Sequence, residues 1–551
     1  MELAIAVAAL GMLVVAGAAA VGPRLRIPAP LILVVLGIVV SLLPFVGVVR
    51  VAPELVLVGI LPPLLYSASV SLPAMDLRRE LGAVSVLSVV LVVVSSLLLG
   101  WLFTLLIPGL DYAWGVALGA VISPTDAVAT SIVKQSGVSH RVTAILEGES
   151  LLNDASALVI LRAAIAGAAA AVSVWNVLGQ FLWAVAGAIV IGVVVGRLTT
   201  RLRARVTDPT VNTVISFTVP FLASLPAERL GASGLVAAVA AGVVVGRRAP
   251  RSLSPQHRRN DEDNWATVSL VLEGAIFLLM GLQIAGILSA AGGPQAGVTA
   301  LGIAVVALVA VVLIRTALVA PLLGLLARRA RRGSGSRGRV EEMQRQLEAG
   351  EPVVVQLPRG RERRFDQSRG RRAFDPKRFQ NRLTQVLADI DYLTSSRLGP
   401  KEGVVIVWAG MRGAVTVAAA QTIPEGSTGP GDELRTLLIL IAFGVAAVSL
   451  LVQGGTLSLL IRLLNPAADD PDELAEERGK VLRMVQDAAD AVPQAAGESR
   501  KAHMLRRLQA SRDALLDARD LGVYDSAVLG HVLATLDSGQ ITLEMQGGPD
   551  G

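Results

Sequence analysis

The chain contains no cysteine and only four histidines among its 551 residues. The missing cysteines exclude disulfide bonds, thiolate metal ligands and thiol chemistry. The histidines are scattered, so they predict no histidine-rich metal centre. The sequence also has no histidine–glutamate metal pair, nucleophile elbow or phosphate-binding loop. These absences disfavour an enzyme and predict no cofactor.

Charged residues are scarce, at 17% of the chain, whereas 53% of the residues are hydrophobic and the mean hydropathy is +0.61. Soluble domains do not have this composition. Apolar runs long enough to span a bilayer recur from Met1 to about Leu464. They predict an all-α polytopic membrane protein with about thirteen transmembrane helices, at 2–21, 28–48, 51–73, 81–107, 112–134, 142–170, 174–198, 209–226, 231–246, 264–287, 296–326, 402–422 and 435–463.

Basic residues are distributed unevenly among the short loops, and this bias sets the orientation of a membrane protein. Loops after odd-numbered predicted helices hold fifteen, namely Arg24, Arg26, Arg78, Arg79, Lys134, Arg141, Arg197, Arg201, Arg203, Arg205, Arg247, Arg248, Arg251, Arg258 and Arg259. The opposite loops hold three, namely Arg50, Arg229 and Arg435. The bias predicts an N-terminus outside and a C-terminus in the cytoplasm. It also explains the net charge of +6 without a nucleic-acid partner.

Two polar segments divide the chain into four parts. We expect transmembrane helices 1–11 in residues 1–327, a basic cytoplasmic insertion in 328–401, helices 12 and 13 in 402–464, and an acidic helical cytoplasmic domain in 465–551. The insertion is either a solvated loop or a loop with short helices, one of them amphipathic and able to lie on anionic lipid. Nothing in the sequence identifies a regulatory ligand for the tail.

The predicted helix at 142–170 carries polar residues at membrane depth. An aspartate at a helix centre costs about 2.5–3.5 kcal/mol on insertion, so its default interpretation is a functional site. Asp154 is too far from either helix end to reach the interface. At 100° per residue, Glu149, Ser150, Asn153 and Asp154 share about 140° of one face. That face must look into the helix bundle or at water.

The preceding predicted helix contains Pro124 in the stretch "GAVISPTDAVATS". Proline removes an amide donor and clashes with the preceding turn, so the helix is expected to break there. A broken helix at membrane depth is tolerated only when it lines a cavity or is buried in protein. Ser123 and Thr125 can satisfy the freed backbone groups, and Asp126 follows at once.

Few counter-charges are available for these acids. Arg315 lies inside the eleventh predicted helix and Glu273 inside the tenth. Arg412 lies in the twelfth, between Gly410 and Gly413, which permit unwinding and close backbone approach. The economical arrangement pairs an arginine with a glutamate and leaves Asp154 free to exchange its charge.

The stretches "EGESLLNDASALV", "GAVISPTDAVAT", "FLLMGL" and "WAGMRGAVTVAAA", in this order and spacing, resemble the sodium/proton exchangers of the cation–proton antiporter-1 family. The resemblance covers about residues 1–464. It implies a thirteen-helix inverted repeat with broken crossover helices, a homodimer, and exchange of sodium or lithium for protons by alternating access. A role in pH regulation follows from that activity.

The resemblance also implies roles for individual residues. Asp154 would bind the cation or the proton, with Ser150 and the backbone around Thr125 completing the coordination of the metal ion. Asn153 and Asp126 would hold the geometry of the site. Glu149 and Arg412 would form a buried ion pair, whereas Arg315 and Glu273 are possible participants. Many relatives carry an acidic residue in the stretch where this chain has Ser67, which removes that carboxylate from the expected ion pathway.

A mechanism follows from the charge of Asp154. Either a proton or a small hard cation can neutralise it, and the two compete for one carboxylate. Asn153 cannot titrate, so we expect electroneutral exchange of one cation for one proton. A potassium/proton antiporter shares all these residues and is the alternative. A channel or a receptor explains the single deep site less well.

Arginine outnumbers lysine 45 to 5, a usage that favours a GC-rich bacterium and its plasma membrane.

Overall fold

The computed structural model describes residues 2–25, 27–44, 47, 49, 51–169, 174–291, 293–349, 353–357, 361–365, 376–395, 398–425 and 429–545. Arg26 and Arg50 of the charge count lie outside these residues, as do parts of the 328–401 insertion and the end of the tail. The chain divides into two compact units. Unit 1 comprises residues 1–321 and 400–466, and unit 2 comprises residues 322–399 and 467–551.

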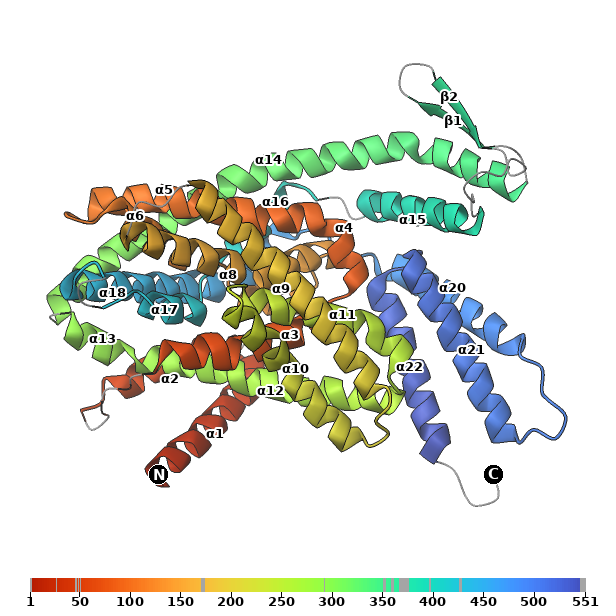
Figure 1. Ribbon diagram of the computed structural model, residues 1–551, viewed down its shortest axis with the longest axis horizontal. Coiled ribbons are helices and arrows are strands. Elements are labelled where there is room, and N and C mark those ends of the chain that lie inside the picture. Colours follow the sequence, from red (N-terminus) through yellow and green to blue (C-terminus); the bar gives the residue numbers. More distant parts are fainter. Residues whose placement is uncertain are drawn as a thin grey trace. The chain divides into compact units, whose positions relative to one another are not determined.

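Unit 1 is built from helices (Figure 1). Its helices before the insertion are α1 (Glu2–Leu25), α2 (Ala29–Ser41), η1 (Leu55–Ile60), α3 (Leu61–Ser71), α4 (Ala74–Ser85), η2 (Val86–Val90), α5 (Leu91–Leu106), α6 (Tyr112–Ile122), α7 (Val128–Gln135), α8 (His140–Ala169), α9 (Val174–Arg203), α10 (Pro209–Arg229), α11 (Gly234–Ser252), α12 (Pro255–Leu282), α13 (Ile284–Ala290) and the first half of α14 (Pro294–Glu348). Those after it are α16 (Pro400–Trp408), α17 (Ala414–Gln421), α18 (Asp432–Ser449), η4 (Leu450–Gly454) and α19 (Gly455–Leu464).

Each of the thirteen predicted segments is helical in the structure. Among the described residues, eight helices are long and apolar enough to cross a membrane, and α2, α3 and α6 are shorter apolar helices. The all-α membrane class is therefore confirmed, whereas the number of crossings stays a prediction. Runs of apolar residues force this outcome because only a helix satisfies its backbone groups internally in lipid.

The helices of unit 1 pack as two groups. The first group contains α1–α3 and α9–α12, in which α2 packs on α12 and α11 packs on α9 and α3. The second group contains α4–α8 and α16–α19, in which α5 packs on α6 and α8 packs on α6 and α4. Glycine permits the close approach of α2 to α12, because a Cβ at Gly37 would lie 2.6 Å from the carbonyl oxygen of Leu278.

Both interrupted helices lie in the second group. Helix α6 ends at Ile122 and α7 begins at Val128, which confirms the predicted break at Pro124. Helix α16 ends at Trp408 and α17 begins at Ala414. The two unwound segments, residues 123–127 and 409–413, meet where the amide of Asp126 donates a 2.7 Å hydrogen bond to the carbonyl of Met411. We call this meeting point the crossing.

Unit 2 contains the second half of α14, the strands β1 (Val353–Leu357) and β2 (Arg361–Phe365), and the helices α15 (Pro376–Ser395), α20 (Pro471–Asp490), α21 (Arg500–Leu521) and α22 (Ser526–Met545). The strands pair antiparallel, a hairpin that neither expectation for the 328–401 insertion included. The insertion does not begin as a loop at residue 328, because α14 continues to Glu348. Val340 on this continuation packs against Leu383 of α15, which supplies the apolar contact that holds it helical.

Helices α20–α22 enclose a small apolar core that includes Val481, Leu515 and Leu529. Just before α21, the Arg506 guanidinium and the Ala495 amide hold the pKa of Glu498 at about 2, well below its ordinary value. The tail therefore folds as a helical domain with its own core, as its apolar spacing predicts.

Candidate functional site

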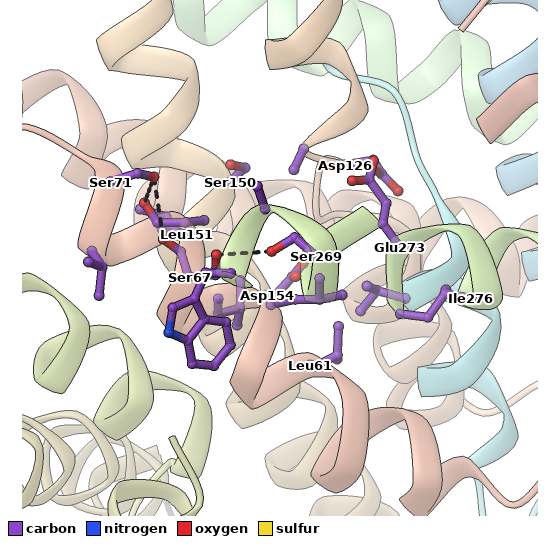
Figure 2. Close-up of a pocket in the computed structure, with 18 of the residues that line it drawn as sticks. Leu61, Ser67, Ser71, Asp126, Ser150, Leu151, Asp154, Ser269, Glu273 and Ile276 are labelled. Carbon is purple, nitrogen blue, oxygen red and sulfur yellow. Dashed lines mark hydrogen bonds between the residues drawn. The ribbon is translucent and has the colours of Figure 1, made fainter. Parts of the chain in front are cut away.

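A cavity of about 660 Å³ lies between the two helix groups of unit 1 (Figure 2). The first group contributes Ser67 of α3 together with Ser269 and Glu273 of α12. The second group contributes Asp126 at the crossing and Asp154 of α8. The cavity extends to the end of α11 and the start of α12, where the basic loops lie, and we call this the basic end of unit 1.

Asp154 occupies the inner limit of this cavity. Its side chain is only 7% exposed. Among the residues that the structure describes, none donates a hydrogen bond to its carboxylate or forms an ion pair with it. On its other side, Asp154 borders a void of only about 10 Å³ that is lined by apolar residues of α6, α8 and α17. The carboxylate is therefore reached from the basic end and blocked toward the opposite end.

Two polar neighbours of Asp154 on α8, Asn153 and Glu149, organise the first unwound segment. Asn153 Nδ2 donates to the hydroxyl of Thr125 at 2.7 Å and to its carbonyl at 3.3 Å. The Thr125 hydroxyl in turn donates to Glu149 Oε1 at 3.1 Å. Ser150 lines the cavity, and its hydroxyl donates to the Glu147 carbonyl at 3.1 Å, which leaves its lone pairs available. The structure thus brings the predicted residues of α8 and the crossing together.

Asp126 joins the two half-helices. Its Oδ1 accepts a 2.9 Å hydrogen bond from the amide of Val128, in the first turn of α7. Its carboxyl group also abuts Gly413, the residue just before α17, where any Cβ would overlap it. Asp126 therefore lies at the N-termini of two half-helices, a position at which the backbone amides favour negative charge.

The predicted ion pair between Glu149 and Arg412 is wrong. Glu149 pairs with Arg315 of α14 instead, through hydrogen bonds of 2.5 Å to Oε1 and 2.7 Å to Oε2. Both side chains are about 1% exposed. The Arg315 Nε also donates to the Ile406 carbonyl at 3.0 Å, near the end of α16. An arginine guanidinium can donate to both oxygens of a carboxylate at once, whereas a lysine ammonium acts as a point charge.

Arg412 caps helix ends and, within the part of the chain that the structure describes, forms no ion pair with a carboxylate. Its guanidinium donates to the carbonyls of Ile122 at 2.9 Å and Ser123 at 3.2 Å, where α6 ends, and also to the carbonyl of Gly410. Carbonyls at the end of a helix lack intrahelical donors and carry partial negative charge. Arg412 and Arg315 therefore stabilise the broken ends of α6 and α16 respectively, in the same way.

Glu273 points toward Asp126 across the cavity (Figure 2). Nearby, the hydroxyl of Ser269 donates to that of Ser67 at 2.9 Å, within the first helix group. Glu273 thus faces the site from α12, as its position in the tenth predicted helix permits. Ser67 occupies the wall of the cavity without contributing a charge.

Two polar residues of the site were missed from the sequence. The Ser449 hydroxyl accepts a 2.9 Å hydrogen bond from the amide of Arg412 and donates to Gln453 Oε1 at 2.5 Å. Gln453 Nε2 donates to the carbonyl of Trp408 at 3.3 Å, just before the second unwound segment. The signal was available, because a serine and a glutamine four residues apart stand out in the apolar stretch of α18 and η4.

The chemistry of the lining favours a small hard cation. Carboxylate, hydroxyl and carbonyl oxygens are the ligands that such cations prefer. Among the described residues, no group of three or more His, Cys, Asp or Glu side chains could hold a resident metal ion. Asp154, an open carboxylate that shares the cavity with Ser150 and Thr125, suits an ion that binds and leaves.

The chain is similar to known proteins. The family model for the transmembrane part of sodium/hydrogen exchangers matches residues 10–350. An uncharacterized Na⁺/H⁺ exchanger of Mycobacterium tuberculosis is 28% identical over 486 residues, which cover 87% of this chain and 77% of that protein. A sodium, potassium, lithium and rubidium/H⁺ antiporter of Bacillus subtilis is 31% identical over 48% of this chain and 41% of that protein. The solved sodium proton antiporter of Methanocaldococcus jannaschii, at pH 8, superposes with a TM-score of 0.55 and 18% identity over 84% of this chain and 100% of that one, and it supports the fold.

Proposed function

The chain belongs to the sodium/hydrogen exchanger family, and from this premise we propose that it exchanges one sodium or lithium ion for one proton across the membrane, electroneutrally and by alternating access. Asp154 binds the cation and the proton in turn. Ser150 and the carbonyl of Thr125 provide further oxygens for the cation, and Asn153 and Asp126 hold the geometry of the site. The carrier works as a homodimer in the bacterial plasma membrane, with its N-terminus outside and its C-terminus in the cytoplasm.

The observation that carries this proposal is the isolation of Asp154. Its carboxylate is nearly buried and has no hydrogen-bond donor or cation among the described residues, although two arginines lie at the same depth of unit 1. A bare carboxylate away from water is costly, so it must be neutralised by something that enters the cavity. A proton or a small cation can do this, and only one of them can occupy it at a time.

Competition of this kind couples the two fluxes without a further device. A carrier whose Asp154 is empty carries the costly charge, whereas a carrier loaded with either ion does not. Reorientation is therefore restricted to the two loaded forms. Each cycle returns a proton in one direction for every cation moved in the other.

Two other acids near the site are committed to partners, which supports the one-to-one ratio. Glu149 is committed to Arg315 through two hydrogen bonds, and Asp126 to the N-termini of two half-helices. Asn153 beside Asp154 is an amide and carries no proton to exchange. Asp154 is thus the carboxylate at the inner limit of the cavity that is left free to change its occupant.

The arrangement of the helices supports alternating access. The cavity reaches Asp154 from the basic end, whereas only a 10 Å³ void lies on its other side. Beyond that void, buried apolar residues from α6, α14, α17 and α18 form a continuous cluster. Opening the opposite end requires a shift between the two helix groups, which contact one another less than they pack internally.

Potassium/proton exchange is the second candidate. It is favoured by one observation, the printed name of the Bacillus subtilis relative, which includes potassium and rubidium. The oxygen ligands of the site accept either ion, so the cavity geometry does not separate them. Proton flux in proteoliposomes, with sodium, lithium and potassium added in turn, distinguishes the two: a response to potassium equal to or greater than that to sodium selects the second candidate.

The central test replaces Asp154 by asparagine. Asp154→Asn keeps the shape of the side chain but removes the exchangeable charge, so sodium-driven proton flux in proteoliposomes should fall to the level of empty liposomes. Asp263→Asn is the matched control, since Asp263 also lies on a membrane helix but its side chain is 62% exposed and outside the cavity. It should exchange at the wild-type rate. Wild-type flux in the Asp154→Asn variant, reconstituted in equal amount, would refute the proposal.

A further inference from the structure

The end of unit 1 opposite the basic end is closed in this structure. Successive predicted membrane segments alternate in direction, so α8, α10, α12 and α17, which end the sixth, eighth, tenth and twelfth of them, all finish at this opposite end. Alternating access requires that this face part at some stage of the cycle. The contacts that join the first helix group to the second there must then break and reform.

One such contact is a hydrogen bond between two glutamine side chains. Gln421 is the last residue of α17, in the second group, and Gln283 is the residue between α12 and α13, attached to the first. Gln421 Nε2 donates to Gln283 Oε1. Gln283 is only 8% exposed, so this bond lies in a protected environment.

The Gln421 end of this contact is anchored to the rest of the second group. The Arg435 guanidinium of α18 donates to the carbonyl of Gln421 at 3.1 Å and to that of Ile423 at 2.7 Å. It also forms a 3.1 Å ion pair with Glu425. A guanidinium that satisfies the final carbonyls of a helix fixes the position of that helix end. Gln421 is therefore presented to Gln283 by a rigid support.

A second polar contact joins the same two groups at the same end. Arg162, near the end of α8, donates to Glu228 Oε2, near the end of α10, at 2.9 Å. Glu228 Oε1 also accepts the amide of Gly234, at the start of α11, at 3.0 Å. The Arg162 side chain is 61% exposed, so this ion pair is weaker than a buried one.

We propose that the hydrogen bond between Gln283 and Gln421, assisted by the pair of Arg162 and Glu228, is a latch that holds the opposite face closed while the cavity is open at the basic end. Gln283 and Gln421 are then positioning residues, because they set the balance between the two access states and touch neither transported ion. This inference rests on the proposed alternating exchange. It adds the polar contacts that must break in each cycle.

The latch uses uncharged amides, and this suits its task. Breaking a buried ion pair leaves uncompensated charges, whereas an amide can rehydrate at modest cost when the face opens. The net value of such a hydrogen bond is small, and its loss should change the equilibrium between the two states about fivefold.

The cysteine-free chain permits a direct test by thiol labelling. Ala419 of α17 lines the small void beside Asp154 and is 4% exposed. In right-side-out membrane vesicles, an Ala419→Cys variant should react slowly with an impermeant maleimide. Adding Gln421→Ala should raise the labelling rate about fivefold, because the face is then open more often. An unchanged or lower rate would overturn the proposal.

A matched control removes a hydrogen bond at the same end but inside the first helix group. Trp183 Nε1 of α9 donates to the carbonyl of Leu230, which follows α10, at 3.0 Å. Trp183→Phe should leave the labelling rate of Ala419→Cys unchanged. An equal rise in this variant would show that any local loosening exposes Ala419, and the latch would then have no special role.

A cross-link tests the latch without weakening the protein. Gln283→Cys/Gln421→Cys, joined by a short bis-methanethiosulfonate reagent, should lose sodium/proton exchange and regain it when the link is reduced. Full exchange by verified cross-linked protein would also overturn the proposal. The labelling assay measures conformation and not ion flux. A rise in labelling in a protein that exchanges no ions would therefore uphold the latch and refute the proposed function.

Discussion

Glu149 is paired with Arg315 and not with Arg412, and this pairing can be tested directly. The perturbation is a pair of double-mutant cycles. One combines Glu149→Gln with Arg315→Met, and the other combines Glu149→Gln with Arg412→Met. Each cycle isolates the free energy with which the two side chains act on one another.

The expected magnitudes follow from the contacts. Arg315→Met leaves the Glu149 carboxylate about 1% exposed and bonded only to the Thr125 hydroxyl among the described residues, and such an uncompensated buried charge costs about 3–5 kcal/mol of unfolding free energy. The same change removes the donor to the Ile406 carbonyl, which adds about 1 kcal/mol. The double variant with Glu149→Gln should recover most of the first cost, because neither charge then remains.

Arg412→Met should also destabilise the protein, since the carbonyls of Ile122 and Ser123 lose their donor. Glu149→Gln should not rescue it, because Glu149 accepts no hydrogen bond from Arg412 in this structure. Equilibrium unfolding in mixed detergent–SDS micelles measures all the variants. A coupling of Glu149 to Arg412 as large as its coupling to Arg315 would refute the assignment of the pair.

The remaining predictions concern transport. With Asp154 as the one exchanged carboxylate, sodium/proton flux in proteoliposomes should be insensitive to a potassium potential set with valinomycin, and a clear voltage dependence would show that a second charge moves. Asn153→Asp adds a titratable group beside Asp154, so any exchange that this variant retains should become voltage-sensitive; a variant as insensitive as the wild type would remove Asn153 from the explanation of the ratio. Gly413→Ala places a methyl group on the Asp126 carboxyl and should lower the rate at least about tenfold, whereas Gly302→Ala, which meets no atom within 4 Å, should not; equal rates in the two would contradict the packing at the crossing.

The broken helices could be read from the sequence because their causes are local. Proline at position 124 cannot continue a helix, and the glycines around Arg412 permit an unwound backbone. The polar face around Asp154 was equally visible, because helical periodicity alone places its members together. The break at Pro124 and the polar face each depend on one continuous stretch of chain, and the structure confirms both.

The partner of Glu149 could not be read in this way. Arg315 and Arg412 both lie deep in predicted apolar helices, and hydropathy gives the depth of a residue but not the direction in which its side chain points. The choice depends on how α14 and α16 pack around α8, which is a tertiary property. The ends of α6 and α16 compete for the same guanidinium groups, and that competition is invisible until both breaks are placed in space.

The continuation of α14 to Glu348 was hidden for a related reason. Its stretch "RRGSGSRGR" has the glycine and serine content of a loop, so local preference argues against a helix. Contacts of Val340 and Met343 with α15 override that preference. The intrinsic helix propensity of a segment decides little where an apolar partner is available to pack against it.

The capping role of Arg412 has a consequence for uncoupled movement of ions through the carrier. At the level of the crossing, the second helix group and α14 together carry three carboxylates, on Asp126, Glu149 and Asp154, and two guanidinium groups, on Arg315 and Arg412. Their sum is one negative charge when Asp154 is bare, and zero when one proton or one sodium ion is bound. If these elements move together, a carrier with Asp154 unoccupied would move a net negative charge across the apolar barrier. A carrier that held two ions at once would move a net positive charge. In the proposed exchange, only single occupancy would give a moving part without net charge, and this would suppress the slippage that dissipates either gradient.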